Sequence, residues 1–420
     1  MPISRRTVGK GALAAAVGLA APPYIARAGE VPVKIGLTMS LTGGLAAGGR
    51  AGLAGLKMWC DDVNKAGGLV GRPVKLIYYD DKTDVALVPG LYARLMDVDQ
   101  VDLLFSPYGT NLVAAVAPML KERNRFVISQ LSIGQNDKLK NYRFFENAPW
   151  GPNAGTEWCR GYFDLAHSKG FKSLAILNSN AEFAANCAVL GENFARDYGM
   201  KIVSKQSYTP GNLDFSNQLN EINATSPDFV WVASYPAESA AIIRSVSEIG
   251  VSNSVQMFGG AMVGVQYADE LKTLGSSLNG LTNYDTLVIA KTMDYPGLDE
   301  FLNTYQAIAQ KENIDALGHF VPPFFYAGGQ FIQQASKATG SIDGGKLASW
   351  LHNNTVDTIV GKIAFNDVGS WTECRVLWNQ LRNVKNNDLE QFRVPGKEII
   401  LKPAELATGD LITPYNVART

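Results

Sequence analysis

The sequence predicts an α/β protein of two lobes, each built around a central, mostly parallel sheet. Short apolar runs of strand length alternate with stretches of helical spacing from Val31 onward. Residues 140–158, rich in Pro, Gly and Asn, then interrupt this alternation, as expected of a crossing between lobes. The same alternation restarts after them, so the second half repeats the architecture of the first.

The first half of the chain begins with a strand and a glycine-rich loop. The pattern predicts strands at 31–40, within 69–84, at 101–107 and at 125–129, with helices at 53–68, 85–100 and 111–124 between them. Asp80 and Asp81 close the second strand, and we interpret them as a turn and a helix cap rather than as catalytic acids. The glycine loop lacks the spacing of a dinucleotide site.

The second half shows the same alternation and then returns to the first lobe. Helices are predicted at 155–170, 181–199, 214–226 and 236–250, and strands at 172–180, 200–208, 228–235 and 255–260. Residues 279–290 have the character of a return crossing. Helices follow at 298–312, 322–340 and 341–354, the last with Ser341 as its cap, and paired strands at 355–371 and 375–383 complete the pattern.

The first 28 residues have the organisation of an export signal. Arg5 and Arg6 precede an apolar run, and Ala26-Arg27-Ala28 forms a cleavage site of the A-x-A type. The apolar run is too short to span a membrane, and the paired arginines are similar to a twin-arginine signal. No Cys lies near the cleavage site, so we expect a soluble periplasmic protein without a lipid anchor.

Composition and motifs argue against several functional classes. The net charge of −1 gives no reason to expect nucleic acid as a partner. The nucleophile elbow, phosphate loop and zinc-protease motifs are absent from the sequence, and its three histidines stand alone. We therefore predict a protein that is not an enzyme and that uses neither a cofactor nor a metal. The four scattered cysteines are expected to be buried free thiols.

Small polar and aromatic residues recur where the predicted strands end. Thr110 and Asn111 stand where a helix cap would lie, so a hydroxyl, an amide and free backbone N–H groups could converge on an anion there. Strand ends of two lobes that face one cleft would surround a small molecule with hydroxyls and amides. The candidate ligand-binding residues are Ser40, Tyr108, Thr110, Asn111, Leu131, Ser132, Asn180, Tyr235 and Ala261.

Four passages carry a resemblance to a known family. They are IGLTMSLTGG at 35–44, NKAGGLVGRPVKLIYYDDKTD at 64–84, the unit at 105–132, and TVDTIVGKIAFNDVGSW at 355–371. Over 31–383 the chain resembles the periplasmic solute-binding proteins of ABC importers, of the leucine/isoleucine/valine-binding type. The resemblance implies the type I periplasmic binding protein fold, two Rossmann-like lobes joined by a three-strand hinge. It places lobe 1 at 31–148 plus 282–355 and lobe 2 at 149–281 plus 356–410.

The resemblance also implies roles for individual residues. Thr110 falls where the family binds a ligand carboxylate. Leu131 to Ile133 fall where a backbone carbonyl and a second hydroxyl grip an α-amino acid, and Ser132 has the only hydroxyl there. Tyr235 matches an aromatic residue of the second lobe. Ala261 stands where amino-acid binders of the family place an acid for the ligand ammonium. Gly48 stands where the family often has an aromatic residue. Small residues at these two positions predict an enlarged pocket for a carboxylate that has no ammonium.

The sequence therefore favours capture of a small carboxylate, an aromatic or branched acid or an amide, by hinge closure. The resemblance implies delivery to an ABC permease in the inner membrane, and we expect the binding protein to be a monomer. Binding of a branched-chain or other amino acid for transport is the alternative. A sensing role beside a membrane kinase or chemoreceptor and an exported α/β hydrolase are further alternatives.

Overall fold

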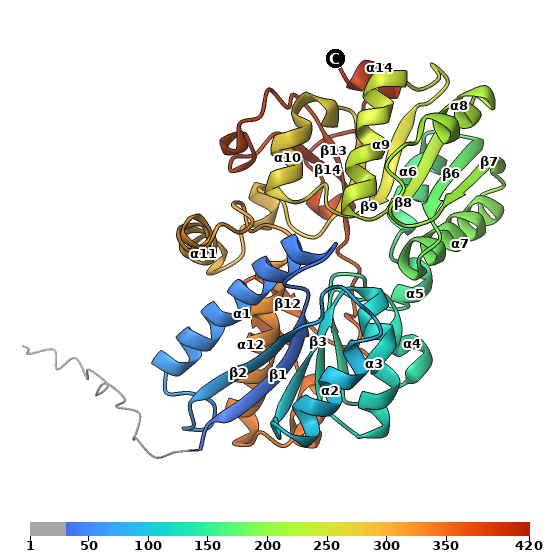
Figure 1. Ribbon diagram of the computed structural model, residues 1–420. Coiled ribbons are helices and arrows are strands. Elements are labelled where there is room, and N and C mark those ends of the chain that lie inside the picture. The colour runs from blue at the N-terminus through green and yellow to red at the C-terminus, as the bar shows by residue number, and fades with distance from the viewer. Residues whose placement is uncertain (1–30) are drawn as a thin grey trace, which may run out of the picture.

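The computed structural model describes residues 31–420, so the predicted export signal lies outside the described residues. These residues form two α/β lobes stacked one above the other, each with its own central sheet (Figure 1). The two-lobe architecture predicted from the sequence is confirmed. Because the two lobes come from interleaved parts of the chain, the chain passes between them more than once.

The first lobe is built on a parallel sheet of five strands in the order β2-β1-β3-β4-β5. The strands are β1 (Val33–Met39), β2 (Val74–Asp80), β3 (Leu103–Tyr108), β4 (Val127–Gln130) and β5 (Phe144–Asn147). Strand β5 lies inside the stretch that the sequence indicated as a crossing. Its four residues are too few to show a strand period, so only the pairing of β5 with β4 identifies it.

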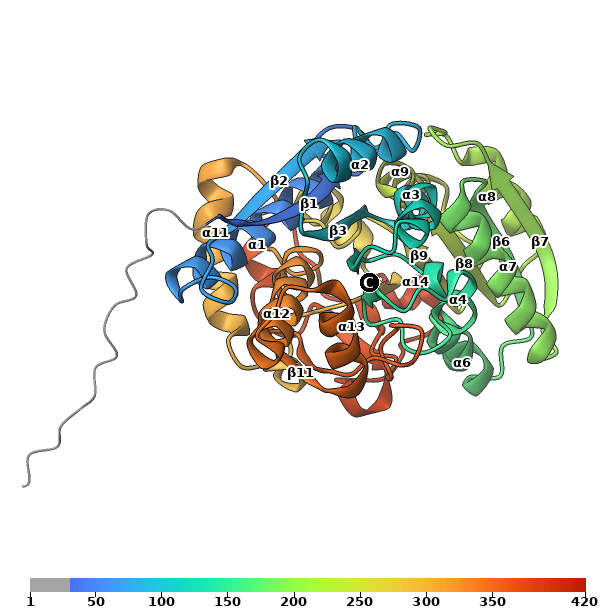
Figure 2. The ribbon, with the colours of Figure 1, turned by 90° about the horizontal axis from the view of Figure 1, so that it is seen from below.

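Helices cover both faces of this sheet. Helices α1 (Ala46–Lys65) and α12 (Pro322–Thr339) lie on one face, and α2 (Val88–Asp97) and α3 (Thr110–Glu122) lie on the other (Figure 2). The first pair approaches closely because glycines line the contact. A Cβ at Gly55 would lie 2.4 Å from the Pro322 carbonyl oxygen, and one at Gly329 would lie 2.1 Å from the Trp59 ring. The lobe is completed by α4 (Gln135–Leu139), α11 (Leu298–Glu312), α13 (Gly344–Asn353) and the hairpin β11 (Val356–Thr358) with β12 (Gly361–Ile363).

The second lobe has a seven-stranded sheet in the order β14-β13-β10-β9-β8-β6-β7. Its strands are β6 (Ser173–Ser179), β7 (Lys201–Tyr208), β8 (Phe229–Ser234), β9 (Met257–Met262), β10 (Thr282–Asp285), β13 (Leu377–Leu381) and β14 (Glu398–Lys402). Strands β13 and β14 are antiparallel to their neighbours and the rest are parallel. Because successive side chains of β6 and β8 point to opposite faces, they build two separate cores.

Helices again cover both faces of the second sheet. One core holds α6 (Arg160–Ser168) and α7 (Glu182–Asp197), and the other holds α8 (Ser216–Ala224), α9 (Pro236–Ile249) and α10 (Ala268–Leu274). The remaining elements are α5 (Ala154–Glu157), α14 (Tyr415–Ala418), η1 (Gly275–Leu278), η2 (Lys291–Met293), η3 (Leu389–Phe392) and η4 (Ala404–Leu406). The single helix expected at 155–170 is thus two helices, α5 and α6.

The lobe boundaries differ from those expected. Strand β10 lies at the start of the expected return crossing but pairs with β9 and β13, so it belongs to the second sheet. The hairpin β11–β12 was expected in lobe 2 but packs on α12 of lobe 1. We therefore propose that lobe 1 comprises 31–147 and 286–372, and that the three passages between lobes follow β5, β10 and β12.

Two local expectations are corrected by hydrogen bonding and burial. Helix α13 is capped by Asp343, whose carboxylate accepts from the N–H groups of Gly345 at 3.0 Å and Lys346 at 2.9 Å. Ser341 instead accepts from the Asp343 N–H at 3.0 Å. All four cysteines are free, but only three are buried and Cys374 is exposed.

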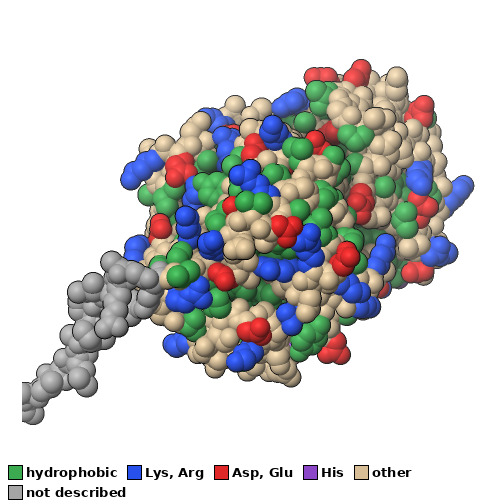
Figure 3. Space-filling view, turned by 60° about the horizontal axis from the view of Figure 1, so that its bottom comes forward, with side chains coloured by type: hydrophobic (Ala, Val, Ile, Leu, Met, Phe, Trp, Pro, Cys, Tyr) green, Lys and Arg blue, Asp and Glu red, His purple; other side chains and the backbone are tan. Residues whose placement is uncertain are grey.

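On the face seen in Figure 3, acidic and basic side chains are interspersed.

Candidate functional site

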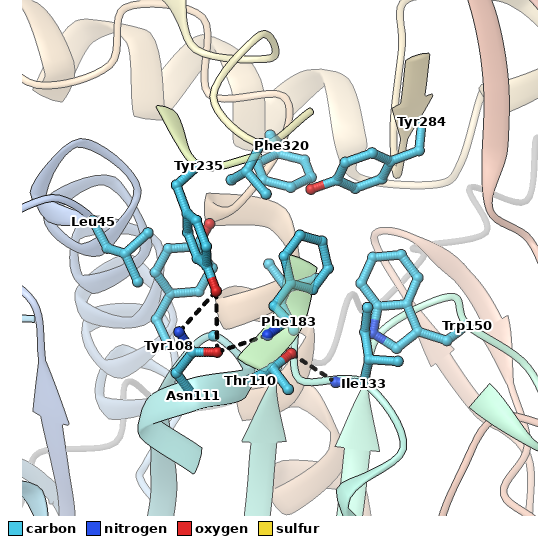
Figure 4. A pocket seen from close by; sticks show the side chains of 13 residues that line it. Leu45, Tyr108, Thr110, Asn111, Ile133, Trp150, Phe183, Tyr235, Tyr284 and Phe320 are labelled. Carbon is cyan, nitrogen blue, oxygen red and sulfur yellow. Dashed lines mark hydrogen bonds between the residues drawn. The ribbon is translucent and has the colours of Figure 1, made fainter. Parts of the chain in front are cut away.

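A cavity lies between the two lobes, at the ends of their strands. It is a small cavity with residues of both lobes in its walls, which suits a small molecule rather than a polymer. None of its lining residues carries a charge, and six are aromatic. Figure 4 shows this lining, which consists of Leu45, Tyr108, Gly109, Thr110, Asn111, Leu131, Ile133, Trp150, Phe183, Tyr235, Val263, Tyr284 and Phe320.

One end of the cavity is formed by the N-terminus of α3. Gly109, with φ of 92°, occupies the cap position. Thr110 was expected to be the cap, but it is the first residue of the helix. The Thr110 hydroxyl oxygen accepts from the Ile133 N–H at 3.2 Å, which leaves the hydroxyl proton available to a ligand. The first N–H groups of a helix have no partner within it and carry a partial positive charge. This end can therefore hold an anionic oxygen.

The turn after β4 forms the wall beside Thr110. Leu131 has φ of 50°, an unfavourable conformation for a branched side chain, and it lines the cavity together with Ile133. Ser132 points away from the cavity, with its hydroxyl 2.8 Å from that of Ser129. Its carbonyl oxygen accepts from the Trp150 indole N–H at 2.8 Å, so Ser132 fixes the Trp150 ring rather than contacting a ligand.

Asn111 joins the two lobes beside the cavity. Its amide nitrogen donates to the Tyr235 hydroxyl at 2.8 Å, and its carbonyl oxygen accepts from that hydroxyl at 3.2 Å and from the Phe183 N–H at 3.1 Å. Leu45, Asn111 and Tyr235 also line a larger groove at the mouth of the cleft. These bonds hold the lobes together, and they have to break if a ligand is to pass that way.

The end opposite Thr110 carries tyrosine hydroxyls. The Tyr108 and Tyr267 hydroxyls lie 2.7 Å apart, and this contact also joins the lobes. Gly48 makes room for it, because a Cβ there would lie 2.5 Å from the Tyr267 hydroxyl. The missing side chain at Gly48 therefore accommodates this tyrosine pair and does not enlarge the pocket, contrary to expectation. Burial raises the pKa of Tyr108 to about 12, so it stays protonated at neutral pH.

Aromatic rings form most of the remaining wall. Tyr284 lies between Trp150 and Phe320, with ring centroids 6.2 Å and 6.0 Å away. Phe183 meets Tyr235 edge to face at 5.9 Å. At these distances the rings contact one another, so they form a continuous aromatic wall along which a flat apolar ligand can pack.

Five of the nine predicted residues line this cavity: Tyr108, Thr110, Asn111, Leu131 and Tyr235. Ser40 does not, because it is fully buried and its hydroxyl donates to Asp81 at 2.6 Å. Asn180 is exposed, and its backbone N–H donates to the Tyr208 carbonyl oxygen. Ala261 is fully buried within β9, and Val263, two residues further on, faces the cavity instead.

Sequence reasoning missed the aromatic residues Trp150, Phe183, Tyr284 and Phe320. Trp150 and Tyr284 lie next to the points where the chain crosses between the lobes, and these crossings run past the cleft. The aromatic residues in the crossing segments were the one sequence signal that could have identified them as cavity residues. Phe320 precedes α12, and nothing in its local pattern distinguishes it from a core residue.

Other kinds of site find no support in residues 31–420. That range holds no group of three or more His, Cys, Asp or Glu side chains that could bind a metal ion. Within the same range no helix is long and apolar enough to cross a membrane.

Comparisons with known proteins agree with this arrangement. A leucine-, isoleucine-, valine-, threonine- and alanine-binding protein of Pseudomonas aeruginosa is 23% identical over 343 residues, which cover 80% of this chain and 86% of that protein. A branched-chain amino acid substrate-binding protein of Streptococcus pneumoniae, solved with isoleucine, has a TM-score of 0.71 at 17% identity and covers 88% of this chain and 100% of its own.

A solute-binding protein of an ABC transporter from Rhodopseudomonas palustris, solved with 3,4-dihydroxybenzoic acid, has the same fold. Its TM-score is 0.71 at 18% identity, with 91% of this chain and 98% of that chain covered. The sequence profile described as "Periplasmic binding protein" matches residues 32–372. The chain therefore belongs to the periplasmic binding protein family.

Proposed function

We propose that this protein is the periplasmic substrate-binding component of an ABC importer and that it captures a small carboxylate without an α-ammonium group. The observation that carries the proposal is the asymmetry of the cavity. One end offers a hydroxyl and a helix N-terminus, and none of the residues that line the cavity is charged.

The Thr110 end suits a carboxylate for electrostatic reasons. Its hydroxyl proton and the free N–H groups of α3 are all donors, and the partial positive charge of the helix adds to them. Hydrogen bonds to a charged acceptor are about twice as strong as neutral ones. No basic side chain is required to hold one carboxylate in such a place.

An ammonium group has no equivalent partner. The residue that faces the cavity at the end of β9 is Val263, and the aromatic walls offer only ring faces and hydroxyls. Burial of an unpaired ammonium costs several kcal/mol, so an ordinary amino acid would bind poorly. The Rhodopseudomonas palustris protein, which shares the fold of this chain, was solved with 3,4-dihydroxybenzoic acid, a carboxylate without an ammonium group.

Ligand contacts with both lobes would stabilise the closed form, which already has the Asn111–Tyr235 and Tyr108–Tyr267 contacts. A ligand that bridges Thr110 in one lobe and the aromatic wall of the other adds to them and shifts the population towards closure. Recognition of that closed form by a membrane permease then couples capture to transport.

Binding of a branched-chain amino acid is the second candidate, favoured by the names of curated relatives at about a quarter identity. It would require the α-ammonium to be held by carbonyl oxygens and ring faces alone.

A thermal-shift panel of amino acids, aromatic acids, aliphatic acids, dicarboxylates and amides tests the proposal. At a concentration of about 100 times Kd, a ligand stabilises the fold by about 2.7 kcal/mol, a rise in Tm of about 3 °C for a chain of this size. We expect such a rise from monocarboxylates. A panel in which only amino acids raise the Tm would refute the proposal.

A further inference from the structure

The end of the cavity opposite Thr110 is polar, although the walls between the two ends are apolar. The Tyr284 side chain is 4% exposed, and Figure 4 shows its hydroxyl pointing into the space on the side away from Thr110. The Gln266 amide donates to the backbone carbonyl oxygen of Tyr284 at 2.9 Å, so it does not occupy the hydroxyl, and burial raises the pKa of the Tyr284 side chain. The hydroxyl therefore keeps its proton and has it free to donate.

The Tyr108–Tyr267 pair belongs to the same end. Two hydroxyls that share one hydrogen bond use one of their two protons, so the pair still has a proton to donate and a lone pair to accept with. The pair packs beside Phe320, with the Tyr267 and Phe320 rings 5.9 Å apart. The pair depends on Gly48, because any larger residue there would clash with the Tyr267 hydroxyl.

We infer that the ligand is an aromatic acid with a hydroxyl group on its ring opposite the carboxylate, and that the Tyr284 hydroxyl recognises that group. This inference rests on the proposed function, because it takes the carboxylate to lie at Thr110. A phenolic hydroxyl both donates and accepts, which matches the groups that Tyr284 and the Tyr108–Tyr267 pair present.

Other chemical groups in place of the ring hydroxyl would fit this end of the cavity less well. A methyl group would leave the Tyr284 hydroxyl, which is buried, without a partner when the cavity closes, and an unpaired buried donor is destabilising. A second carboxylate would be buried with no cation among the lining residues. A quaternary ammonium could bind to the ring faces, as in aromatic cages, but it cannot accept the tyrosine proton.

The test measures Kd by isothermal titration calorimetry for benzoate, 4-methylbenzoate, 4-hydroxybenzoate and glycine betaine. The proteins are the wild type, Tyr284→Phe and the control Tyr305→Phe. Tyr305 is buried like Tyr284, but it does not line the cavity, and its hydroxyl has no hydrogen-bond partner within the described residues. We expect the wild type and Tyr305→Phe to bind 4-hydroxybenzoate about tenfold more tightly than benzoate.

In Tyr284→Phe the preference for 4-hydroxybenzoate over benzoate should disappear, because the phenyl ring keeps the apolar wall and only the hydroxyl is lost. Equal binding of benzoate and 4-hydroxybenzoate by the wild type, or a preference that survives in Tyr284→Phe, would overturn the inference and leave the proposed function standing. Tighter binding of glycine betaine or 4-methylbenzoate would also overturn it. Failure of every aromatic acid to bind would overturn the proposed function with it.

Discussion

Two neighbouring pairs of strand ends in the first sheet carry small polar residues and use them in opposite ways. The ends of β1 and β2 bring Ser40 together with Asp80 and Asp81, and the ends of β3 and β4 bring Thr110 beside the turn at Leu131. Both are rich in small polar groups, and both lie on the side of the sheet that faces the cleft. Only the second pair of ends contributes strand-end polar groups to the cavity.

The difference lies in how far each set of polar groups is already paired. The Asp81 carboxylate accepts from the hydroxyls of Thr38 and Ser40 and from the Thr83 N–H, so this strand end is saturated internally. Thr110 accepts one N–H and keeps its proton, next to a helix N-terminus. A polar strand end becomes a binding site where donors are left over, and residue type alone does not reveal this.

The largest expected effect is on stability, at the saturated strand end. Asp81→Ala leaves two buried hydroxyls and a backbone N–H without their acceptor, so we expect the free energy of unfolding to fall by about 3 kcal/mol in urea denaturation. Asp80 accepts from the Thr42 hydroxyl and from three backbone N–H groups, but it lies at the more exposed edge of the turn, where water can replace it. Asp80→Ala should therefore cost less, about 1 kcal/mol. A tenfold loss of benzoate affinity in folded Asp81→Ala would contradict the contrast between the two strand ends.

The next effect is on affinity, at the strand end with a free donor. Thr110→Val removes the hydroxyl that faces the ligand and keeps the side-chain shape, so the Kd of benzoate should rise about 10- to 100-fold by calorimetry. Thr38→Val makes the same change where the hydroxyl is already bonded to Asp81. It should lower stability and leave the Kd within about twofold. The contrast fails if both variants weaken binding equally.

A smaller effect is expected from the direct bonds between lobes. Asn111→Leu removes the bonds to Tyr235 and Phe183 and so weakens the closed form, which should raise the benzoate dissociation rate about five- to tenfold in stopped-flow experiments. Asn180→Leu is the matched control, because Asn180 is exposed and does not line the cavity. An unchanged rate in Asn111→Leu would mean that these bonds do not contribute to ligand retention.

The smallest effect concerns pH and ligand affinity. Among the residues that line the cavity, burial raises the pKa of Tyr108 and Tyr235 to about 12, so no lining group titrates near neutrality. We expect the Kd of benzoate to stay constant between about pH 6 and pH 9, because a carboxylic acid is ionised throughout that range. A Kd that changes tenfold over this range would show that a titrating group reaches the ligand.

Stability, in contrast, should depend on pH over that range. Burial raises the pKa of Glu146 from 4.5 to about 7, so the folded state keeps a proton that the unfolded state has already released. The folded state is therefore favoured most below about pH 4.5, and this contribution is lost as pH rises through about 7. Glu146→Gln should flatten the dependence of the unfolding free energy on pH between about 4.5 and 7. An unchanged slope would mean that another group causes the pH dependence.

The sequence predicted the lobes and most strands because they depend on local periodicity, which the chain carries in every segment. It predicted Thr110, Asn111 and Tyr235 because each stands where a strand gives way to a helix. It could not distinguish Ser40 from Thr110, because the pairing of Ser40 with Asp81 joins residues 41 positions apart. Tyr284 and Phe320 were missed for a similar reason, since only the approach of the two lobes brings them to the cavity.

The position expected to hold the acid illustrates the limit of residue-by-residue transfer. Ala261 lies within β9 and faces the core, and Val263 occupies the cavity wall. Both residues are apolar, so neither β9 nor the residue that follows it brings an acid to the cavity, and the absence of an ammonium site there stays a prediction.

Calorimetric titration with ligand pairs that differ only by the α-ammonium tests the central claim most directly. The pairs are leucine with 4-methylpentanoate and phenylalanine with 3-phenylpropanoate. With no acid facing the cavity, we expect at least one of the two acids that lack the amino group to bind about 100-fold more tightly than its amino acid. Equal or tighter binding of the amino acids would contradict the account, because it would show that the cavity holds an ammonium group without a carboxylate partner.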